Sequence, residues 1–326
     1  MQEIFLGEAM KKRRLELGLT QEQLCNGICE PVTISRLENG KQTPSRRNLN
    51  ALLGRLSMPT DRYYALLSNR EKEVERIWHL ITSYNVKFTQ ASAENRNQIR
   101  NDCLALHAQL RKIADDHDVL IQQHLLRSVL LLGKDDGPYS FEEQVELLQS
   151  AIHLTLPNFN LHEIYSGLYS IDEIKLINQL ATVYMTSGHH WEAIEILSQL
   201  YRYIKQNFSN ATLTRAAVGM VAYNYANELY TIEQYQRAID LIKEAIDLVI
   251  NCASTQALPE LVGLSAECYH FLGDDQKSLE LFYESFYLMK VLKKDRNCKN
   301  LVEDAKKLLG IDISLPPLQY QKSDLD

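Results

Sequence analysis

The last third of the chain repeats one pattern of small and large apolar residues at helical spacing. Three segments align at intervals of 45 and 40 residues, and each carries a small residue, a turn position seven residues later and a second small residue five residues beyond the turn. These positions are Ala181, Gly188 and Ala193, then Ala226, Glu233 and Ala238, and then Ala266, Gly273 and Ser278. Small residues let two antiparallel helices approach closely, and each helix pair buries its apolar face only by stacking on its neighbours. The pattern therefore predicts a solenoid of helix pairs.

The rest of the chain is also predicted to be helical. Valine and isoleucine fall at helical spacing, and the few Gly and Pro residues, 13 and 8 in number, lie between the periodic segments. Helices are expected over residues 70–88, 95–114, 119–132, 141–154 and 172–186. The spacing resembles the tetratricopeptide repeat, although the period is longer than the about 34 residues of that repeat. The expected fold is all-α, with a five-helix helix-turn-helix domain followed by an α-solenoid of tetratricopeptide-like repeats.

Charge is distributed unevenly along the chain. The whole sequence has a formal net charge of -7, but residues 1–67 contain ten Lys and Arg against seven Asp and Glu, a net charge of +3. A nucleic-acid partner would therefore contact the N-terminal part. The expected organisation is a DNA-binding domain at 1–67, a linker helix at 68–90, a tetratricopeptide-like domain at 91–312 and a C-terminal tail at 313–326.

Composition excludes several classes of protein. An apolar fraction of 45% and a charged fraction of 24% are those of a folded protein rather than a disordered one. There is no run of about 18 apolar residues and no N-terminal basic stretch followed by an apolar one, so no membrane contact and a cytoplasmic location are expected. The six cysteines are scattered without the spacing of a metal site, and we expect them to be reduced thiols.

The residues that most resemble an enzyme site are His189, His190 and Glu192. Their spacing is not a recognised metal-ligand set, and no Gly-rich phosphate loop or nucleophile elbow accompanies them. We therefore expect no catalytic residues, no metal and no cofactor.

The strongest local signal is a helix-turn-helix pattern over residues 18–40. Thr20 and Gln23 form a capping box that predicts the start of a short helix. Pro31 suits the first turn of the next helix, and Gly40 suits a left-handed cap at its end. Flanking core residues are expected at Leu6, Leu15, Leu49, Leu52 and Leu56.

The second helix of such a unit lies in the major groove of double-stranded DNA. Arg36 can donate two hydrogen bonds to guanine, and the methyl groups of Val32 and Thr33 can pack on thymine. A further set of polar and basic residues is predicted to hold backbone phosphates, which fixes register without reading sequence. This set is Gln21, Ser35, Lys41, Arg46 and Arg47.

Residues 6–67 resemble the Cro and phage-repressor type of helix-turn-helix, with a turn at residues 26–30 that is one residue shorter than usual. Together with the repeats and the segment at residues 154–159, this shortened turn resembles the PlcR and NprR group within the Rgg, Rap, NprR, PlcR and PrgX superfamily. The resemblance covers nearly the whole chain. It implies a quorum-sensing regulator that binds DNA as a homodimer and whose hold on DNA is shifted by a short signalling peptide bound to the concave repeat surface.

Peptide-binding residues are predicted from the positions that line the concave face of tetratricopeptide repeats. Asparagine carboxamides can both donate to and accept from an extended peptide, and tyrosine offers an apolar body with a polar tip. The predicted residues are Asn178, Tyr223, Asn227, Tyr230, Glu267 and His270, with Lys175 one turn earlier as a partner for a carboxylate.

Two other functions are compatible with the same pattern. The repeats could act on a protein partner, as Rap-like members do, with the helix-turn-helix in a secondary role. The chain could also be a phage or plasmid repressor without a peptide ligand. The operator, the peptide and the sign of regulation are not encoded in any motif.

Overall fold

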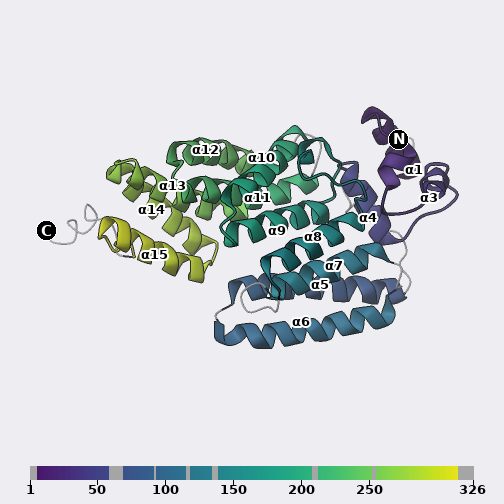
Figure 1. Ribbon diagram of the computed structural model, residues 1–326, viewed down its shortest axis with the longest axis horizontal. Helices are drawn as coiled ribbons and strands as arrows, with labels where there is room; N and C mark the ends of the chain where they lie inside the picture. Colours follow the sequence, from purple (N-terminus) through teal and green to yellow (C-terminus); the bar gives the residue numbers. More distant parts are fainter. Residues whose placement is uncertain are drawn as a thin grey trace. The chain divides into compact units, whose positions relative to one another are not determined.

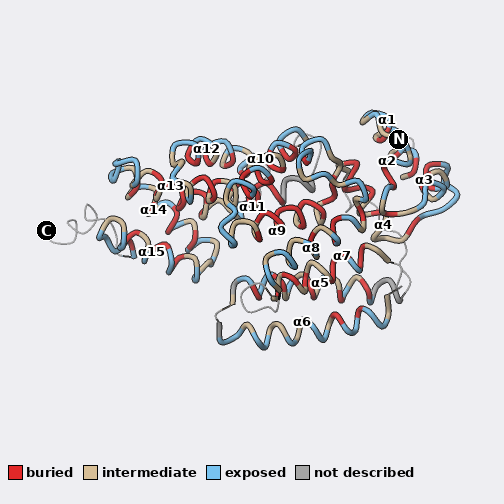
Figure 2. Tube along the Cα trace, viewed as in Figure 1, coloured by how far each residue is buried: buried red, intermediate tan, exposed pale blue. Residues whose placement is uncertain are grey.

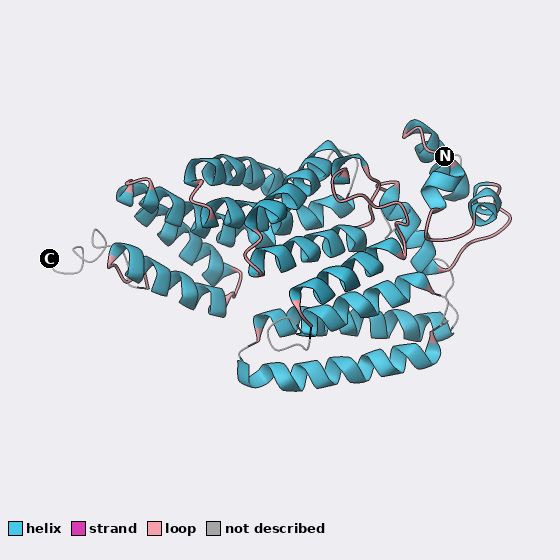
Figure 3. Ribbon diagram, in the orientation of Figure 1, coloured by secondary structure: helices cyan, strands magenta, loops and turns pink. Residues whose placement is uncertain are grey.

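The computed structural model describes residues 6–58, 69–91, 93–114, 118–133, 139–207, 212–251 and 255–314, and within these ranges the regular structure is entirely helical (Figures 1 and 3). The predicted all-α fold is therefore confirmed. The expected fifth helix of the N-terminal domain and the tail after residue 314 lie outside the described residues. None of the described helices is both long and apolar enough to cross a membrane.

The chain divides into two compact units, which we describe separately. The first consists of residues 1–187 with 206–214, and the second of residues 188–205 with 215–326. Within the first unit, the N-terminal helices are α1 (Leu6–Glu16), α2 (Gln21–Cys25), α3 (Pro31–Glu38) and α4 (Arg46–Arg55). The helices that follow are α5 (Asn69–Gln90), α6 (Ala93–Ile113), α7 (Val119–Gly133), α8 (Phe141–His153) and α9 (Ile171–Thr186), with a short 3-10 helix at Ile164–Ser166.

The local signals predicted for the helix-turn-helix are present. The Thr20 side chain caps α2 and Gln23 completes the capping box, Pro31 opens α3, and Gly40 adopts a left-handed φ of 67° just after α3. The domain encloses its own core, which contains Met10, Leu24, Cys25, Ile28, Ile34, Leu37, Leu49, Leu52, Leu53 and Leu56.

The expectation that Leu15 belongs to this core is wrong. Its side chain is 60% exposed, whereas the neighbouring residue Arg14 is buried. The inward position on α1 is filled by Arg14 because its guanidinium has a buried carboxylate partner, which makes a charged side chain tolerable there.

Helices α5 to α9 lie side by side in the first unit, each packed on the next along the chain (Figure 1). Helices α5, α6 and α7 share a core that includes Val74, Ile77, Cys103, Ile121 and Leu125. Figure 2 shows that α6 is mostly exposed, whereas much of α9 is buried. Helix α9 is therefore held on several sides, which makes it a rigid support for residues that contact it.

The second unit contains α12 (Tyr235–Asn251), α13 (Leu258–Phe271), α14 (Asp275–Val291) and α15 (Asp295–Leu309), most of α10 (His190–Asn207) and most of α11 (Thr212–Thr231), with a short 3-10 helix at Thr255–Ala257. Helices α12 to α15 pack consecutively. The small positions of the repeat lie in the interior, because Ala238, Ala266 and Ser278 are completely buried. The predicted helix pairs are thus present, and their small positions are used as expected.

The predicted turn positions share a left-handed backbone. The φ angles are 79° at Gly188, 61° at Glu233 and 84° at Gly273. An L-residue in this conformation has a steric cost of about 1–2 kcal/mol that glycine avoids. Glu233 therefore occupies a glycine-type position, and this strain is compensated by the packing of the helices on either side.

We expect Gly273→Ala to lower the free energy of unfolding by about 1 kcal/mol, because alanine is strained at positive φ. Glu233→Gly should not lower it. Urea unfolding followed by circular dichroism measures both changes. The matched control is Gly133→Ala, where an added Cβ would meet only the Tyr139 ring at 4.0 Å. Equal losses for Gly273→Ala and Gly133→Ala would show that the turn conformation is not what requires glycine.

Candidate functional site

Helix α3 presents a solvent-facing surface on the side opposite its core residues. Ile34 and Leu37 are buried, whereas Val32 is 52% exposed and Arg36 is also exposed. Residues three and four apart share one face of a helix, so Val32 and Thr33 lie beside Arg36. Arg36 has one long contact, from its Nη1 to Oε1 of Gln42 at 3.4 Å. Two methyl-bearing side chains and a guanidinium therefore form one accessible patch.

The end of α3 is fixed by a buried carboxylate. Glu38 accepts two hydrogen bonds from Arg14 on α1, at 2.6 and 2.9 Å, and a third from the Gln21 carboxamide on α2, at 2.8 Å. Burial alone would raise the pKa of Glu38, but the hydrogen bonds from Arg14 and Gln21 outweigh it and hold the pKa below its usual value. Glu38 is therefore an anion that joins three helices and sets the angle at which α3 is presented.

The other predicted DNA-binding residues lie in different environments. Lys41 is exposed, Ser35 is half-buried on α3, and Arg46 is half-buried at the start of α4. The Gln21 side chain, at the start of α2, is half-buried and engaged with Glu38. Arg47 forms an ion pair with Asp118, which also accepts from the backbone N–H of Ile121 at 3.2 Å in the first turn of α7. A phosphate contact by Arg47 would have to compete with this carboxylate.

Arg55, at the end of α4, is the most heavily used side chain of the N-terminal domain. Its Nη1 donates to the carbonyl oxygens of Leu24 and Asn26, at 3.0 and 2.7 Å. Its Nη2 donates to the carbonyl oxygen of Thr155 at 2.9 Å and to the carboxylate of Glu173 on α9 at 2.8 Å. The Arg55 and Glu173 side chains are each only 1% exposed. One guanidinium therefore joins the end of α2, the loop after α8 and the first turn of α9.

The turn between α2 and α3 lies directly against the same loop. Gly27 has a φ of 72°, and a Cβ at this position would fall 1.9 Å from the carbonyl oxygen of Thr155. The Thr155 hydroxyl accepts from the buried Gln123 carboxamide of α7 at 2.7 Å. Backbone thus meets backbone at this point, which requires glycine at position 27 and fixes the turn relative to α7, α8 and α9.

Arg55 and Glu173 are functional residues that the sequence reasoning missed. Arg55 follows Leu52, Leu53 and Gly54 and precedes Leu56, so it is a lone charge inside an apolar run. A charge on an inward face predicts a buried partner of opposite sign. Its partner is 118 residues away, and sequence spacing alone could not identify it.

Five of the predicted peptide-binding residues lie in the second unit. Tyr223, Asn227 and Tyr230 follow one another along α11, Glu267 and His270 lie on α13, and all five are half-buried. The Tyr230 hydroxyl hydrogen-bonds to Glu267. Burial, and to a lesser extent the negative charge of this carboxylate, raises the pKa of Tyr230. Burial raises the pKa of Glu267 to about 6. His270 is paired with Asp275 at 2.6 Å.

Tyr223 also lines a cavity of about 250 Å³ in the second unit. Glu260 lines the same cavity, and its Oε1 is held by Lys294 and Asn297 at 2.6 Å each. Its Oε2 is buried without a hydrogen-bond partner among the described residues. The cavity thus offers an apolar surface with one available acceptor.

The remaining two predicted peptide-binding residues, Lys175 and Asn178, lie on α9 in the first unit. Asn178 is buried. Lys175 is half-buried and pairs with Asp172 at 3.1 Å. The structure therefore brings together the five residues of the second unit, and it places Lys175 and Asn178 on a helix of the other unit.

The histidines that most resembled an enzyme site have structural partners. His190 pairs with the buried Glu228 at 2.8 Å, and His189 lies 3.7 Å from Glu192. Within the described part of the chain, no three His, Cys, Asp or Glu side chains come close enough to hold a metal ion.

These features define a class of protein: a helix-turn-helix unit with an accessible recognition helix, followed by stacked helical repeats. Comparison with models of protein families supports the same class. A model described as "Helix-turn-helix" matches residues 10–62, and one described as "RNPP family C-terminal domain" matches residues 144–309, just over half of the chain. The chain belongs to the RNPP family, and it is a DNA-binding transcription regulator rather than an enzyme.

Solved structures share the fold over most of the chain. PlcR of Bacillus thuringiensis in complex with the peptide PapR7 and DNA is 20% identical, with a TM-score of 0.55 and coverage of 91% of this chain and 99% of that one. The apo form of PlcR is 19% identical, with a TM-score of 0.54 and coverage of 91% and 98%. A comparison with curated protein sequences gave no match.

We expect Arg55→Met to lower the free energy of unfolding by about 3–5 kcal/mol, because it leaves the buried Glu173 carboxylate without its cation. Guanidinium unfolding of the full chain gives the value. Arg76→Met is the control, since Arg76 forms an exposed pair with Glu73 at 2.7 Å and its loss should change stability little. If the two variants unfold at the same denaturant concentration, Arg55 does not hold the junction, that is, the contact of the helix-turn-helix domain with α9 and the loop after α8.

Proposed function

We propose that this regulator binds double-stranded DNA as a homodimer in the cytoplasm, and that a short signalling peptide bound by the repeat helices controls its hold on DNA. The proposed domains are a DNA-binding domain at 1–67, a linker helix at 68–90, a peptide-sensing domain at 91–312 and a tail at 313–326. Two recognition helices are needed to read two half-sites one helical turn apart, which favours a dimer.

The observation that carries the proposal is the exposed patch of Val32, Thr33 and Arg36 on a helix whose orientation is fixed. The Glu38 carboxylate holds α3 to α1 and α2, while Arg55 and Gly27 hold α2 and its turn to the loop after α8. A recognition helix must be both accessible and rigid, because base contacts depend on a fixed register. Ser35, Lys41, Arg46 and Arg47 remain the proposed phosphate contacts, together with Gln21.

The peptide part of the proposal is supported by the chemistry of α11 and α13. Tyr223, Asn227, Tyr230, Glu267 and His270 combine two aromatic bodies, a carboxamide and two titratable groups within one unit. The cavity beside Tyr223 has a volume of about 250 Å³, and the Oε2 of Glu260, which lines it, has no hydrogen-bond partner among the described residues. PlcR, which shares the fold, is described as bound to both a peptide and DNA. Lys175 and Asn178 remain proposed contacts from α9.

We expect Arg36→Ala to weaken binding to a preferred duplex by about tenfold or more and to abolish the preference at one base pair, because a bidentate guanine contact contributes about 1–3 kcal/mol. The preferred duplex is obtained by selection from a random library with the wild-type chain, and gel-shift titration compares it with single-base variants. Lys41→Gln is the matched comparison. It should weaken all duplexes alike and lower the salt dependence by about one unit.

An Arg36→Ala protein that loses affinity equally for every duplex would place Arg36 on phosphate rather than on a base. If Arg36→Ala retained full selectivity among the duplexes, α3 would be excluded as the recognition helix.

We expect Asn227→Ala to weaken peptide binding by about tenfold, because one carboxamide provides two hydrogen bonds of about 0.5–1.5 kcal/mol each to an extended backbone. Isothermal titration uses a peptide selected from a random heptapeptide library on the wild-type chain. Asn251→Ala is the matched control, since Asn251 is exposed at the end of α12. Unchanged affinity in Asn227→Ala would remove α11 from the peptide site.

A further inference from the structure

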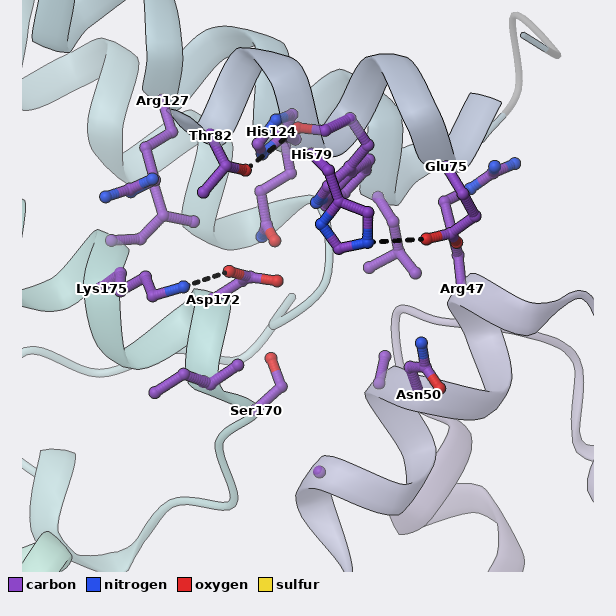
Figure 4. Close-up of a pocket in the computed structure, with 17 residues that line it drawn as sticks. Arg47, Asn50, Glu75, His79, Thr82, His124, Arg127, Ser170, Asp172 and Lys175 are labelled. Atoms are coloured by element: carbon purple, nitrogen blue, oxygen red, sulfur yellow. Dashed lines mark hydrogen bonds and ion pairs between the residues drawn. The ribbon is translucent and has the colours of Figure 1, made fainter. Parts of the chain in front are cut away.

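A cavity of about 270 Å³ lies in the first unit, where the DNA-binding domain meets the helices that follow it. It is lined by residues from four helices, α4, α5, α7 and α9, and Figure 4 shows their side chains converging from different directions. Its volume is just below the range of about 300–1,000 Å³ that small-molecule sites occupy. The cavity therefore suits a ligand smaller than a typical drug-sized molecule, and it is too small for a peptide of several residues.

One part of the wall is aromatic and contains an unused polar atom. The Trp78 and His124 rings stack at 3.9 Å with an angle of 11° between their planes. His124 is only 6% exposed, and its Nε2 has no hydrogen-bond partner among the described residues. Burial lowers the pKa of His124 to about 3, so the ring is neutral near pH 7. A buried polar atom without a partner is costly, and a ligand group that reached it would remove this cost.

Near these rings, the part of the wall around Asp172 carries more positive than negative charge. Asp172 pairs with Lys175 at 3.1 Å and is also stabilised as an anion by Arg127, so two cations share one carboxylate (Figure 4). The Nε of Arg127 is buried and has no partner in the described part of the chain. The N-terminal turn of α9, from Ser170 to Asp172, faces the same space and adds partial positive charge.

Two further charged groups at the cavity have partners of their own. Arg47 is paired with Asp118, and the carboxylate of Glu75 lies 3.7 Å from the exposed His79 ring, which carries a charge only when it is protonated. The excess of cations is therefore local to Asp172, where Arg127 and Lys175 face one carboxylate. A cationic ligand would be repelled there, and a polyphosphate would exceed both the volume and the number of available cations.

We propose that this cavity binds a small monocarboxylate with a compact apolar body. Its carboxylate would accept hydrogen bonds from Arg127 and Lys175, and its body would lie against the side chains of Leu120, Trp78 and Leu176, which line the same space. The site is separate from the proposed peptide residues on α11 and α13, and it shares only Lys175 with the proposed peptide contacts. It does not depend on peptide control of DNA binding, because it is defined by residues of the first unit alone.

Occupancy of the site would stabilise the junction around Arg55. Helix α4 contributes Asn50, Ala51 and Gly54 to the wall, and α9 contributes Asp172, which precedes Glu173, and Lys175 one turn later. A ligand that contacts both helices favours the arrangement in which they are docked, and it raises the stability of that arrangement by mass action.

The test uses the full chain without peptide or DNA, with benzoate and hexanoate as probes and benzamide and hexanamide as uncharged isosteres. Isothermal titration and thermal unfolding should show binding and stabilisation by at least one acid, with its amide at least about tenfold weaker, because a charge-assisted contact is replaced by a neutral one. This comparison needs no variant, so it stands whether or not a substituted chain folds.

Lys175→Gln should weaken binding of the acid by about tenfold. Lys277→Gln is the matched control, since Lys277 forms the same type of pair, three residues apart, with Glu280 at 3.0 Å on α14. Failure of both acids to bind at millimolar concentration, equal binding of acid and amide, or equal losses in the two lysine variants would each overturn the proposal. Binding of a selected peptide is measured separately, so the two conclusions can fail independently.

Discussion

The arrangement of the N-terminal domain on the rest of the first unit depends on the four hydrogen bonds of Arg55. A guanidinium this deeply buried is tolerated because its two Nη groups donate to three main-chain carbonyls and one carboxylate, although its Nε is buried without a partner among the described residues. Arginine suits this position better than lysine, since its planar fork can serve acceptors on two sides at once. The acceptors lie at the end of α2, in the loop after α8 and in the first turn of α9. A single side chain therefore couples the position of α9 to that of the helix-turn-helix domain.

A second buried ion pair, between Arg14 and Glu38, acts inside the helix-turn-helix itself. It joins α1 to the end of α3, and Gln21 adds a bond from α2. The two arginines therefore have complementary roles. Arg14 fixes the recognition helix within its domain, and Arg55 fixes the domain against α9 and the loop after α8. Together they give α3 a defined orientation although its outer face makes few contacts of its own.

Much of the fold could be predicted from sequence because the signals are local. The capping box at Thr20, Pro31 at the start of α3 and the turn positions at Gly188 and Gly273 act within a few residues, and each appears in the structure as expected. The expectation for Leu15 failed because helical periodicity cannot distinguish an inward leucine from an inward arginine that has a partner. The junction around Arg55 and the cavity beside it were not foreseen, since both require residues from helices more than a hundred positions apart.

The contact between the turn of the helix-turn-helix and the loop after α8 is made largely by main-chain atoms. Leu24, Asn26 and Thr155 offer carbonyl oxygens to Arg55, and Gly27 lies against the Thr155 backbone. Any amino acid supplies a carbonyl, so on the DNA-binding side this docking constrains side-chain identity mainly at positions 27 and 55 and at Arg47, which pairs with Asp118 just before α7. A helix-turn-helix domain with a different recognition helix can therefore be joined to the same helices if it keeps those three residues, which separates the choice of DNA target from the contacts that hold the domain in place.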